Sequence, residues 1–135
     1  MNNKEYIDIL NALLKKMDVE GFYFGFSRYN PSKIALFIPY EKDDRYVFQW
    51  YEFESIEHIF NTNDHIGDLL SIIEKAKLRG NNGTDINCNT DNVLGINVLG
   101  INDSGIEFLK LLDRCVGCSS LAEFKMKLQL MGYET

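Results

Sequence analysis

Residues 22–53 read FYFGFSRYNPSKIALFIPYEKDDRYVFQWYEF, and three runs within this stretch alternate apolar with other side chains. Alternation with a period of two is the pattern of a β-strand that buries one of its faces. Polar connections at residues 29–32 and 41–45 separate the runs, and the first contains Asn30 and Pro31, which favour a turn. Because successive strands joined by short connections usually pair with each other, this stretch predicts a three-stranded antiparallel meander.

Helical periodicity precedes and follows the meander. Residues 4–17 carry a broad apolar stripe at helical spacing, and Asn2 or Asn3 can cap the start of this helix. After the meander, residues 55–61 predict a short helix and residues 64–79 predict a longer one.

The C-terminal part of the chain contains a tandem repeat, VLGIN at residues 93–97 and again at residues 98–102. A period of five suits neither a strand nor a helix, so we interpret the repeat as an apolar strand with a bend at a glycine. Ser-x-x-Glu patterns at residues 104–107 and 120–123 predict capping boxes that open two further helices. Residues 124–130 also alternate as a strand would, but the capping box before them favours a helix.

Together these elements predict an α+β fold in the order α-β-β-β-α-α-(β)-α-α, with one helix before the meander and several after it. We expect the helices to pack on one face of a small antiparallel sheet. A chain of 135 residues suits one domain, and such a chain buries roughly two-thirds of its unfolded surface. Residues 1–135 are therefore interpreted as a single domain, which could divide only at the polar loop of residues 80–92.

The composition is that of a cytoplasmic protein. No apolar run approaches the roughly 20 residues that cross a bilayer, and the N-terminus lacks the basic and apolar regions of a signal peptide. The cysteine count, Cys 3, is odd, as expected for reduced thiols. We therefore expect a cytoplasmic location and no contact with a membrane.

Negative charge is concentrated in one quarter of the chain. Between Glu41 and Glu74 the sequence holds nine acids and two bases, a charge of −7, whereas the whole chain carries −6, so the remainder sums to +1. Such a segment suits a basic partner and opposes contact with phosphate groups. It can equally serve as a solvated face that keeps the protein soluble.

The α-β-β-β-α order of residues 1–79 resembles that of a double-stranded-RNA-binding domain in topology alone. These residues hold ten bases against thirteen acids, and the last of their helices has no basic cluster at its N-terminus. Because contact with RNA phosphates requires cations, we expect no direct binding of nucleic acid.

Aromatic side chains are concentrated in the meander, which holds twelve of the seventeen in the chain (Phe 9, Tyr 7, Trp 1). A face covered by helices uses only the side chains that alternate onto it. If the second face is open, it displays a tyrosine-rich surface of the kind that binds partners. If residues 93–131 cover that face instead, its side chains belong to the core, and the sequence leaves both arrangements open.

The CVGC motif at residues 115–118 most invites a chemical function. It lacks the βαβ context of a redox-active CxxC motif, and small apolar residues in a tight turn between helices explain it as well. A zinc site could combine Cys115 and Cys118 with Cys88 and a histidine, but the sequence contains only one close pair of such ligands. We therefore expect no metal and no cofactor.

No catalytic motif is present either. His58 and His65 lie seven residues apart across a break between helices, and neither has a fixed partner or the spacing of a known catalytic motif. An enzyme built on Cys115, Cys118 or the histidines is thus the least supported hypothesis, and we favour a non-enzymatic function.

Two other hypotheses remain. The first is a protein that docks on another protein with a basic surface, such as a nucleic-acid enzyme, and modulates or inhibits it. The second is a small-ligand binder or sensor, with an aromatic pocket between the sheet and the helices or at the interface of a homodimer. The first hypothesis predicts contacts from the acidic and aromatic part of the meander: Tyr40, Asp43, Asp44, Tyr46, Trp50, Tyr51 and Glu52.

Overall fold

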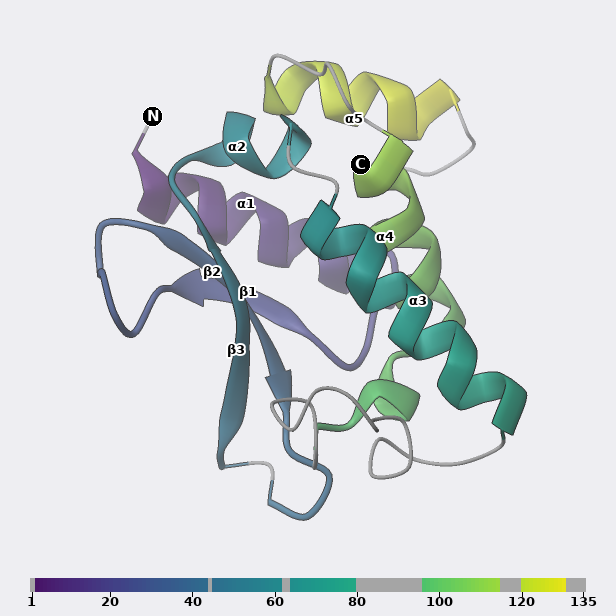
Figure 1. Ribbon diagram of the computed structural model, residues 1–135. Helices are drawn as coiled ribbons and strands as arrows, with labels where there is room; N and C mark the ends of the chain where they lie inside the picture. Colours follow the sequence, from purple (N-terminus) through teal and green to yellow (C-terminus); the bar gives the residue numbers. More distant parts are fainter. Residues whose placement is uncertain (1, 44, 62–63, 80–95, 115–119, 131–135) are drawn as a thin grey trace.

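The computed structural model describes residues 2–43, 45–61, 64–79, 96–114 and 120–130 (Figure 1). The fold is α+β, as the sequence predicts, with one helix, a three-stranded antiparallel sheet and then several helices. None of the described helices is long and apolar enough to span a membrane. The elements are α1 (Asn3–Lys16), β1 (Tyr23–Phe26), β2 (Ile34–Pro39), β3 (Val47–Phe53), α2 (Ile56–Asn61), α3 (Asp64–Arg79), the 3₁₀ helix η3 (Val98–Gly100), α4 (Asp103–Arg114) and α5 (Leu121–Leu130).

Helix α1 has the cap and the buried stripe that its sequence predicts. The Asn2 side-chain oxygen accepts a hydrogen bond from the backbone N–H of Glu5 at 3.0 Å, which satisfies one of the free donors of the first turn. The stripe, which includes Leu10, is buried. The helix ends before Asp18, whose φ of 59° lies in the left-handed region that Asp tolerates better than most residues. The helix predicted over residues 4–17 is confirmed to within one residue at each end.

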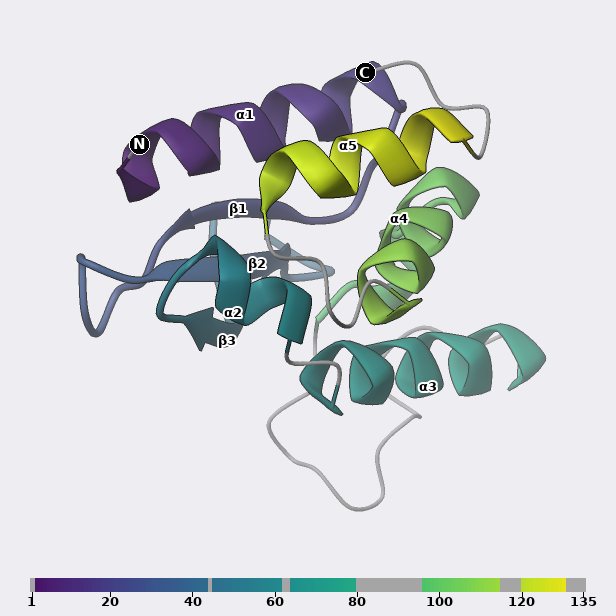
Figure 2. The same ribbon diagram turned by 90° about the horizontal axis from the view of Figure 1, so that it is seen from above.

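The sheet has the order β1-β2-β3, with both neighbouring pairs antiparallel. Helix α1 runs beside β1 (Figure 2), and there the side chain of Asn11 takes the place of a further strand. The Asn11 amide nitrogen donates to the carbonyl oxygen of Phe24 at 2.8 Å, and the Asn11 amide oxygen accepts from the N–H of Phe24 at 2.9 Å. These two bonds satisfy groups that an edge strand would otherwise offer to another chain.

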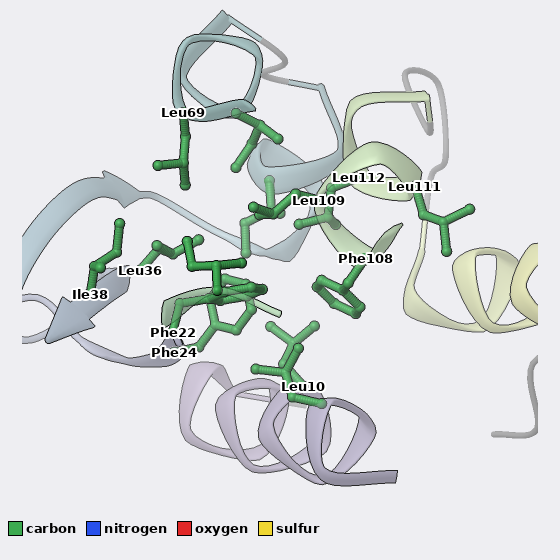
Figure 3. Packing of buried hydrophobic residues seen from close by; sticks show 14 of the residues in the cluster. Leu10, Phe22, Phe24, Leu36, Ile38, Leu69, Phe108, Leu109, Leu111 and Leu112 are labelled. Atoms are coloured by element: carbon green, nitrogen blue, oxygen red, sulfur yellow. The ribbon is translucent and has the colours of Figure 1, made fainter. Parts of the chain in front are cut away.

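The core lies between one face of the sheet and the helices (Figure 3). Phe22 and Phe24 both contact Phe108 of α4, with ring centroids 6.1 and 6.4 Å apart respectively. Phe108 in turn contacts Phe124 of α5 at 5.8 Å, and Phe124 contacts Phe60 of α2 at 5.1 Å. A path of aromatic rings therefore ties the sheet to three of the helices that follow it.

On the second face of the sheet, side chains of the sheet and its turns pack against one another. Tyr23 and Phe37 lie opposite each other on β1 and β2 and therefore project to the same face, away from the Phe24 and Leu36 side. Their rings stack with centroids 5.5 Å apart, and the Arg28 guanidinium lies 5.6 Å from the centre of the Phe37 ring. Phe37 is buried, whereas Tyr23 remains 40% exposed.

Residues 96–130 do not use that second face. Their buried residues belong to the same core cluster as Phe24 and Leu36. Of the two arrangements that the sequence left open, the described part of the chain therefore has the helices and the 96–102 segment on a single face of the sheet.

The strand predicted across the tandem repeat is wrong for the part of the repeat that the structure describes. Ile96 makes one isolated antiparallel bridge with Tyr40, and the chain then turns into η3. The cause is the Asn97 side chain, whose oxygen accepts from the N–H of Gly100 at 3.0 Å and so caps a turn in place of a strand. Residues 93–95 lie outside the described residues.

Tertiary contacts hold this segment against the loop that follows α1. Gly21 has a φ of 104°, and a Cβ atom there would lie 2.5 Å from the Cα of Ile101, so only glycine fits. The Asn102 side-chain nitrogen donates to the carbonyl oxygen of Asp18 at 2.6 Å, and its oxygen accepts from the N–H of Glu20 at 3.0 Å. The sequence could not reveal these contacts, because they join residues more than eighty positions apart.

Asn102 also corrects the predicted start of α4. The helix begins at Asp103, and the Asn102 oxygen accepts from the N–H of Gly105 at 2.9 Å, so the cap is Asn102 and not Ser104. For α5 the predicted cap is confirmed, since the N–H of Glu123 donates to the Ser120 hydroxyl at 3.2 Å. Residues 121–130 form a helix, which excludes the alternative strand.

Removing the Asn11 side chain should cost stability. We expect Asn11→Ala to lower the free energy of unfolding by about 1–3 kcal/mol, because it leaves the half-buried N–H and C=O of Phe24 without partners. Urea denaturation measures the change, and hydrogen exchange should report faster exchange at the Phe24 amide. The exposed Lys15→Ala on the same helix is the control and should change stability by less than about 0.5 kcal/mol. Equal effects of the two variants would contradict the edge-capping role.

Candidate functional site

Both histidines of the chain lie beside Tyr51 of β3. The Tyr51 and His65 rings are stacked, with centroids 3.5 Å apart and planes inclined by 18°. The His58 ring approaches Tyr51 edge-on at 6.3 Å and Phe53 at 5.8 Å. We call these four residues and Trp50 the Tyr51 cluster. Sequence spacing fixes no partner for either histidine, and it is the tertiary structure that places both beside Tyr51.

An irregularity in β3 creates the cluster. Leu36 pairs with Tyr51 and Phe37 pairs with Gln49, so Trp50 is an extra residue in the strand, a β-bulge. Strict alternation would place Trp50 and Tyr51 on opposite faces, but both pack against the core. The Trp50 indole nitrogen donates to the carbonyl oxygen of His65 at 2.8 Å, which holds the first turn of α3 against β3.

Hydrogen bonds with the preceding residues orient His58. The Nδ1 atom of His58 accepts a hydrogen bond from the N–H of Glu54 at 2.9 Å, and the N–H of His58 donates to the Ser55 hydroxyl at 3.2 Å. An Nδ1 atom that accepts cannot carry a proton, so the ring proton of neutral His58 is on Nε2. The junction between β3 and α2 is thereby tied to the ring that faces Tyr51 and Phe53.

Three exposed carboxylates lie close in sequence to members of the Tyr51 cluster. Glu54 directly follows Phe53, and its side chain is 75% exposed and lies 4.0 Å from the Lys33 ammonium. Asp68 lies three residues after His65 on α3, so the two side chains project from the same face of the helix, and Asp68 is exposed. Glu57, in the first turn of α2, is also exposed. We call these three residues the acidic rim.

The contacts that the sequence predicts do not form one surface. Tyr40, Asp43 and Tyr46 lie at the turn between β2 and β3, where Tyr46 is 60% exposed. Trp50 and Tyr51 lie farther along β3 and pack against the core. Glu52 pairs with Ala35 and therefore projects to the opposite face, and Asp44 lies outside the described residues.

Asp43 is already neutralised within its own turn. Its carboxylate accepts from the Arg45 guanidinium at 3.2 Å on both oxygens and from the backbone N–H of Arg45 at 3.0 Å. The side-chain bonds first, and then the backbone bond, hold the pKa of Asp43 below its ordinary value. A partner would have to compete with Arg45 for this carboxylate.

Glu52 is engaged on the second face of the sheet. The Ser27 hydroxyl donates to one of its oxygens at 2.5 Å, and the Lys33 ammonium lies 3.5 Å from the other. The Gln49 amide donates to the same Ser27 hydroxyl at 3.1 Å. Glu52 therefore fixes the turn between β1 and β2 and contributes less free charge than the sequence indicates.

Two surface hollows lie away from the Tyr51 cluster. One, of about 660 Å³, lies between α3 and α4, and the other, of about 220 Å³, lies between α1 and α5. Their linings are aliphatic and charged, and neither includes an aromatic side chain. They do not supply the stacking surface that the small-ligand hypothesis requires.

The three cysteines lie outside the described residues, so the structure does not bear on the redox and zinc alternatives for Cys88, Cys115 and Cys118. Within the described ranges, no three His, Asp or Glu side chains gather as a metal ion would require. Comparison of the chain with protein-family models, curated proteins and solved structures finds no match. Functional inference therefore depends on the geometry of the chain itself.

Replacing Trp50 by phenylalanine should weaken the attachment of α3 to β3. We expect Trp50→Phe to lower the free energy of unfolding by about 1 kcal/mol, because the ring is kept but the bond to the His65 carbonyl is lost. Urea unfolding followed by circular dichroism measures the change. Tyr46→Phe, at an exposed position of the same hairpin, is the matched control and should be near neutral.

Arg45 should control the titration of Asp43. We expect Arg45→Gln to raise the pKa of Asp43 toward its ordinary value, because the guanidinium no longer stabilises the carboxylate. In the wild-type protein the pair is present at neutral pH and is lost as the pH falls through the lowered pKa of Asp43. Carbon-detected NMR titration of the carboxyl group measures both values, and an unchanged pKa in the variant would contradict the assignment.

Proposed function

We propose that the chain is a non-enzymatic protein-binding module that docks on a basic partner and modulates or inhibits it. The observation that carries the proposal is the Tyr51 cluster with its acidic rim: the half-buried rings of Trp50, Tyr51 and the two histidines, with exposed carboxylates close to them in sequence. The aromatic rings offer contact area at low cost in entropy, and the carboxylates offer charge.

The acidic rim replaces Asp43 and Glu52 as the main source of charge in this proposal. Asp43 is paired with Arg45, Glu52 is paired with Lys33 and Ser27, and Glu54 lies 4.0 Å from the same Lys33. These pairs are partly exposed, and the nearby cations reduce the net charge that the paired carboxylates offer to a partner. Among the described residues, neither Glu57 nor Asp68 has a hydrogen bond or ion pair through its side chain.

Trp50 and Tyr51 keep their place in the proposed contact set, and Tyr40, Asp43 and Tyr46 extend it toward the hairpin turn. All of these residues lie on or beside β3, which runs from that turn to α2 (Figure 1). The segment from Glu41 to Glu74 carries −7, and a field of this sign increases the rate at which a cationic surface associates. A partner that normally holds nucleic acid has such a surface.

Charge reversal in the acidic rim should slow association with the partner. The wild-type chain, immobilised, captures the partner from its native lysate, and surface plasmon resonance then measures association at about 0.05 M and about 0.3 M salt. We expect the triple variant Glu54→Lys, Glu57→Lys and Asp68→Lys to lower the association rate at low salt by about tenfold or more. The difference should shrink at the higher salt concentration because of screening.

A control triple variant separates local from overall charge. Glu5→Lys, Asp8→Lys and Glu20→Lys change the net charge by the same amount at exposed positions on or just after α1, beside β1 and at the far side of the sheet from β3. The control should lower the rate by less than about threefold. Equal losses in both variants, or a captured partner with an acidic binding surface, would contradict the proposal.

A further inference from the structure

The backbone of β3 has an edge whose direction follows from the hydrogen bonds already described. The N–H and C=O of Phe24 in β1 bond to Asn11 and therefore point away from β2. In an antiparallel ladder the residue opposite, Leu36, then directs its own N–H and C=O away from β1 and toward β3. Pro39 gives an independent check, because its carbonyl accepts from Asn97 on the β1 side of β2. Alternation from these points directs the backbone N–H and C=O of Val47, Gln49 and Glu52 away from β2.

The two edges of the sheet therefore differ. On β1 the outward groups of Phe24 are closed by Asn11, whereas on β3 the outward groups of Val47, Gln49 and Glu52 have no hydrogen-bond partner among the described residues. An edge strand of seven residues, whose outward backbone groups are unpaired within the described part of the chain, is a template for another strand. In Figure 2, β3 lies on the side of the sheet away from α1.

Charge decides which strand can pair there. A second copy of this chain would carry the same net charge of −6 and the same acidic residues along β3, which opposes its approach to this edge. Like charges placed opposite each other across strands destabilise the pair. An extended segment with lysine or arginine at alternate positions would instead present its cations on one face, toward the exposed carboxylates of the acidic rim.

We infer that an extended basic segment of the partner binds as a fourth strand, antiparallel or parallel, along the outer edge of β3. The inference rests on the function proposed above and names the mode of binding. The bulge at Trp50 interrupts regular pairing, so Val47 and Gln49, each with one N–H and one C=O, form the first pairs. The backbone supplies affinity, and the Tyr51 cluster and acidic rim supply selectivity for a cationic strand.

The probe for this inference is an acetylated peptide of about eight residues in which lysine and valine alternate. Hydrogen exchange, followed by ¹⁵N NMR on the full chain, should show that the peptide protects the amides of Val47 and Gln49. Fluorescence of Trp50, the sole tryptophan, reports the dissociation constant. Protection at these two amides is expected because strand addition hydrogen-bonds outward N–H groups that have no partner among the described residues.

Two variants at one position give the matched comparison. Val47→Pro removes an outward N–H that β2 does not use, and edge strands tolerate proline at such positions. We expect it to weaken peptide binding by about tenfold or more, while Val47→Thr, which keeps the N–H, changes binding by less than about threefold. If Val47→Pro does not fold, the protection measured on the wild-type chain still decides the question.

The outcomes separate strand addition from the proposed function. If binding requires the acidic rim but leaves Val47 and Gln49 unprotected, strand addition is wrong and the acidic surface stands. If the peptide does not bind, or binds equally to the acidic-rim variant, both proposals fail. If the two amides become protected without peptide as the protein concentration rises, the edge binds a second copy of the chain. That result would overturn the inference that a basic segment of a partner binds there.

Discussion

The structure depends on the contact of Phe108 with the sheet. Phe22 and Phe24 present their rings on one face of β1, and Phe108 of α4 is the residue through which the C-terminal helices meet them. Phe124 and Phe60 continue the same path into α5 and α2. A three-stranded sheet has too little area of its own to form a stable core, so it requires this helical layer. Packing the layer on one face leaves the second face and the strand edges to meet solvent or a partner.

The two edges of the sheet are treated differently by the chain. Asn11 satisfies the outward groups of Phe24 on β1, and α1 lies beside that strand. On β3 the outward backbone N–H and C=O groups have no hydrogen-bond partner among the described residues. The bulge at Trp50 also turns two successive aromatic side chains toward the helices. The bulge and the stack of Tyr51 on His65 bring the junction of β3, α2 and α3 together with the exposed carboxylates of the acidic rim. This coincidence of an edge strand, aromatic rings and negative charge is the basis for the proposed binding function.

The ion pairs of the structure show which acidic residues carry charge that no neighbouring cation offsets. Counted along the sequence, Asp43 and Glu52 belong to the acidic segment on the same terms as Asp68. In the structure Asp43 is held by Arg45 and Glu52 by Lys33 and Ser27, whereas Asp68 and Glu57 act outward. The segment of −7 thus contains carboxylates that stabilise turns and exposed carboxylates, such as those of Asp68 and Glu57, that do not.

The sequence by itself determined the elements whose causes are local. Alternation predicts the meander, the apolar stripes predict the helices, and Asn2 and Ser120 cap the helices that they precede. Only the tertiary structure decided the features whose causes are distant. Asn102 caps α4 while it bonds to Asp18 and Glu20, which lie more than eighty positions earlier in the chain. The bulge at Trp50 also depends on how β3 pairs with β2, and the contact of both histidines with Tyr51 depends on how α2 and α3 pack against β3. Such features require residues far apart in sequence to come together, so local sequence patterns do not predict them.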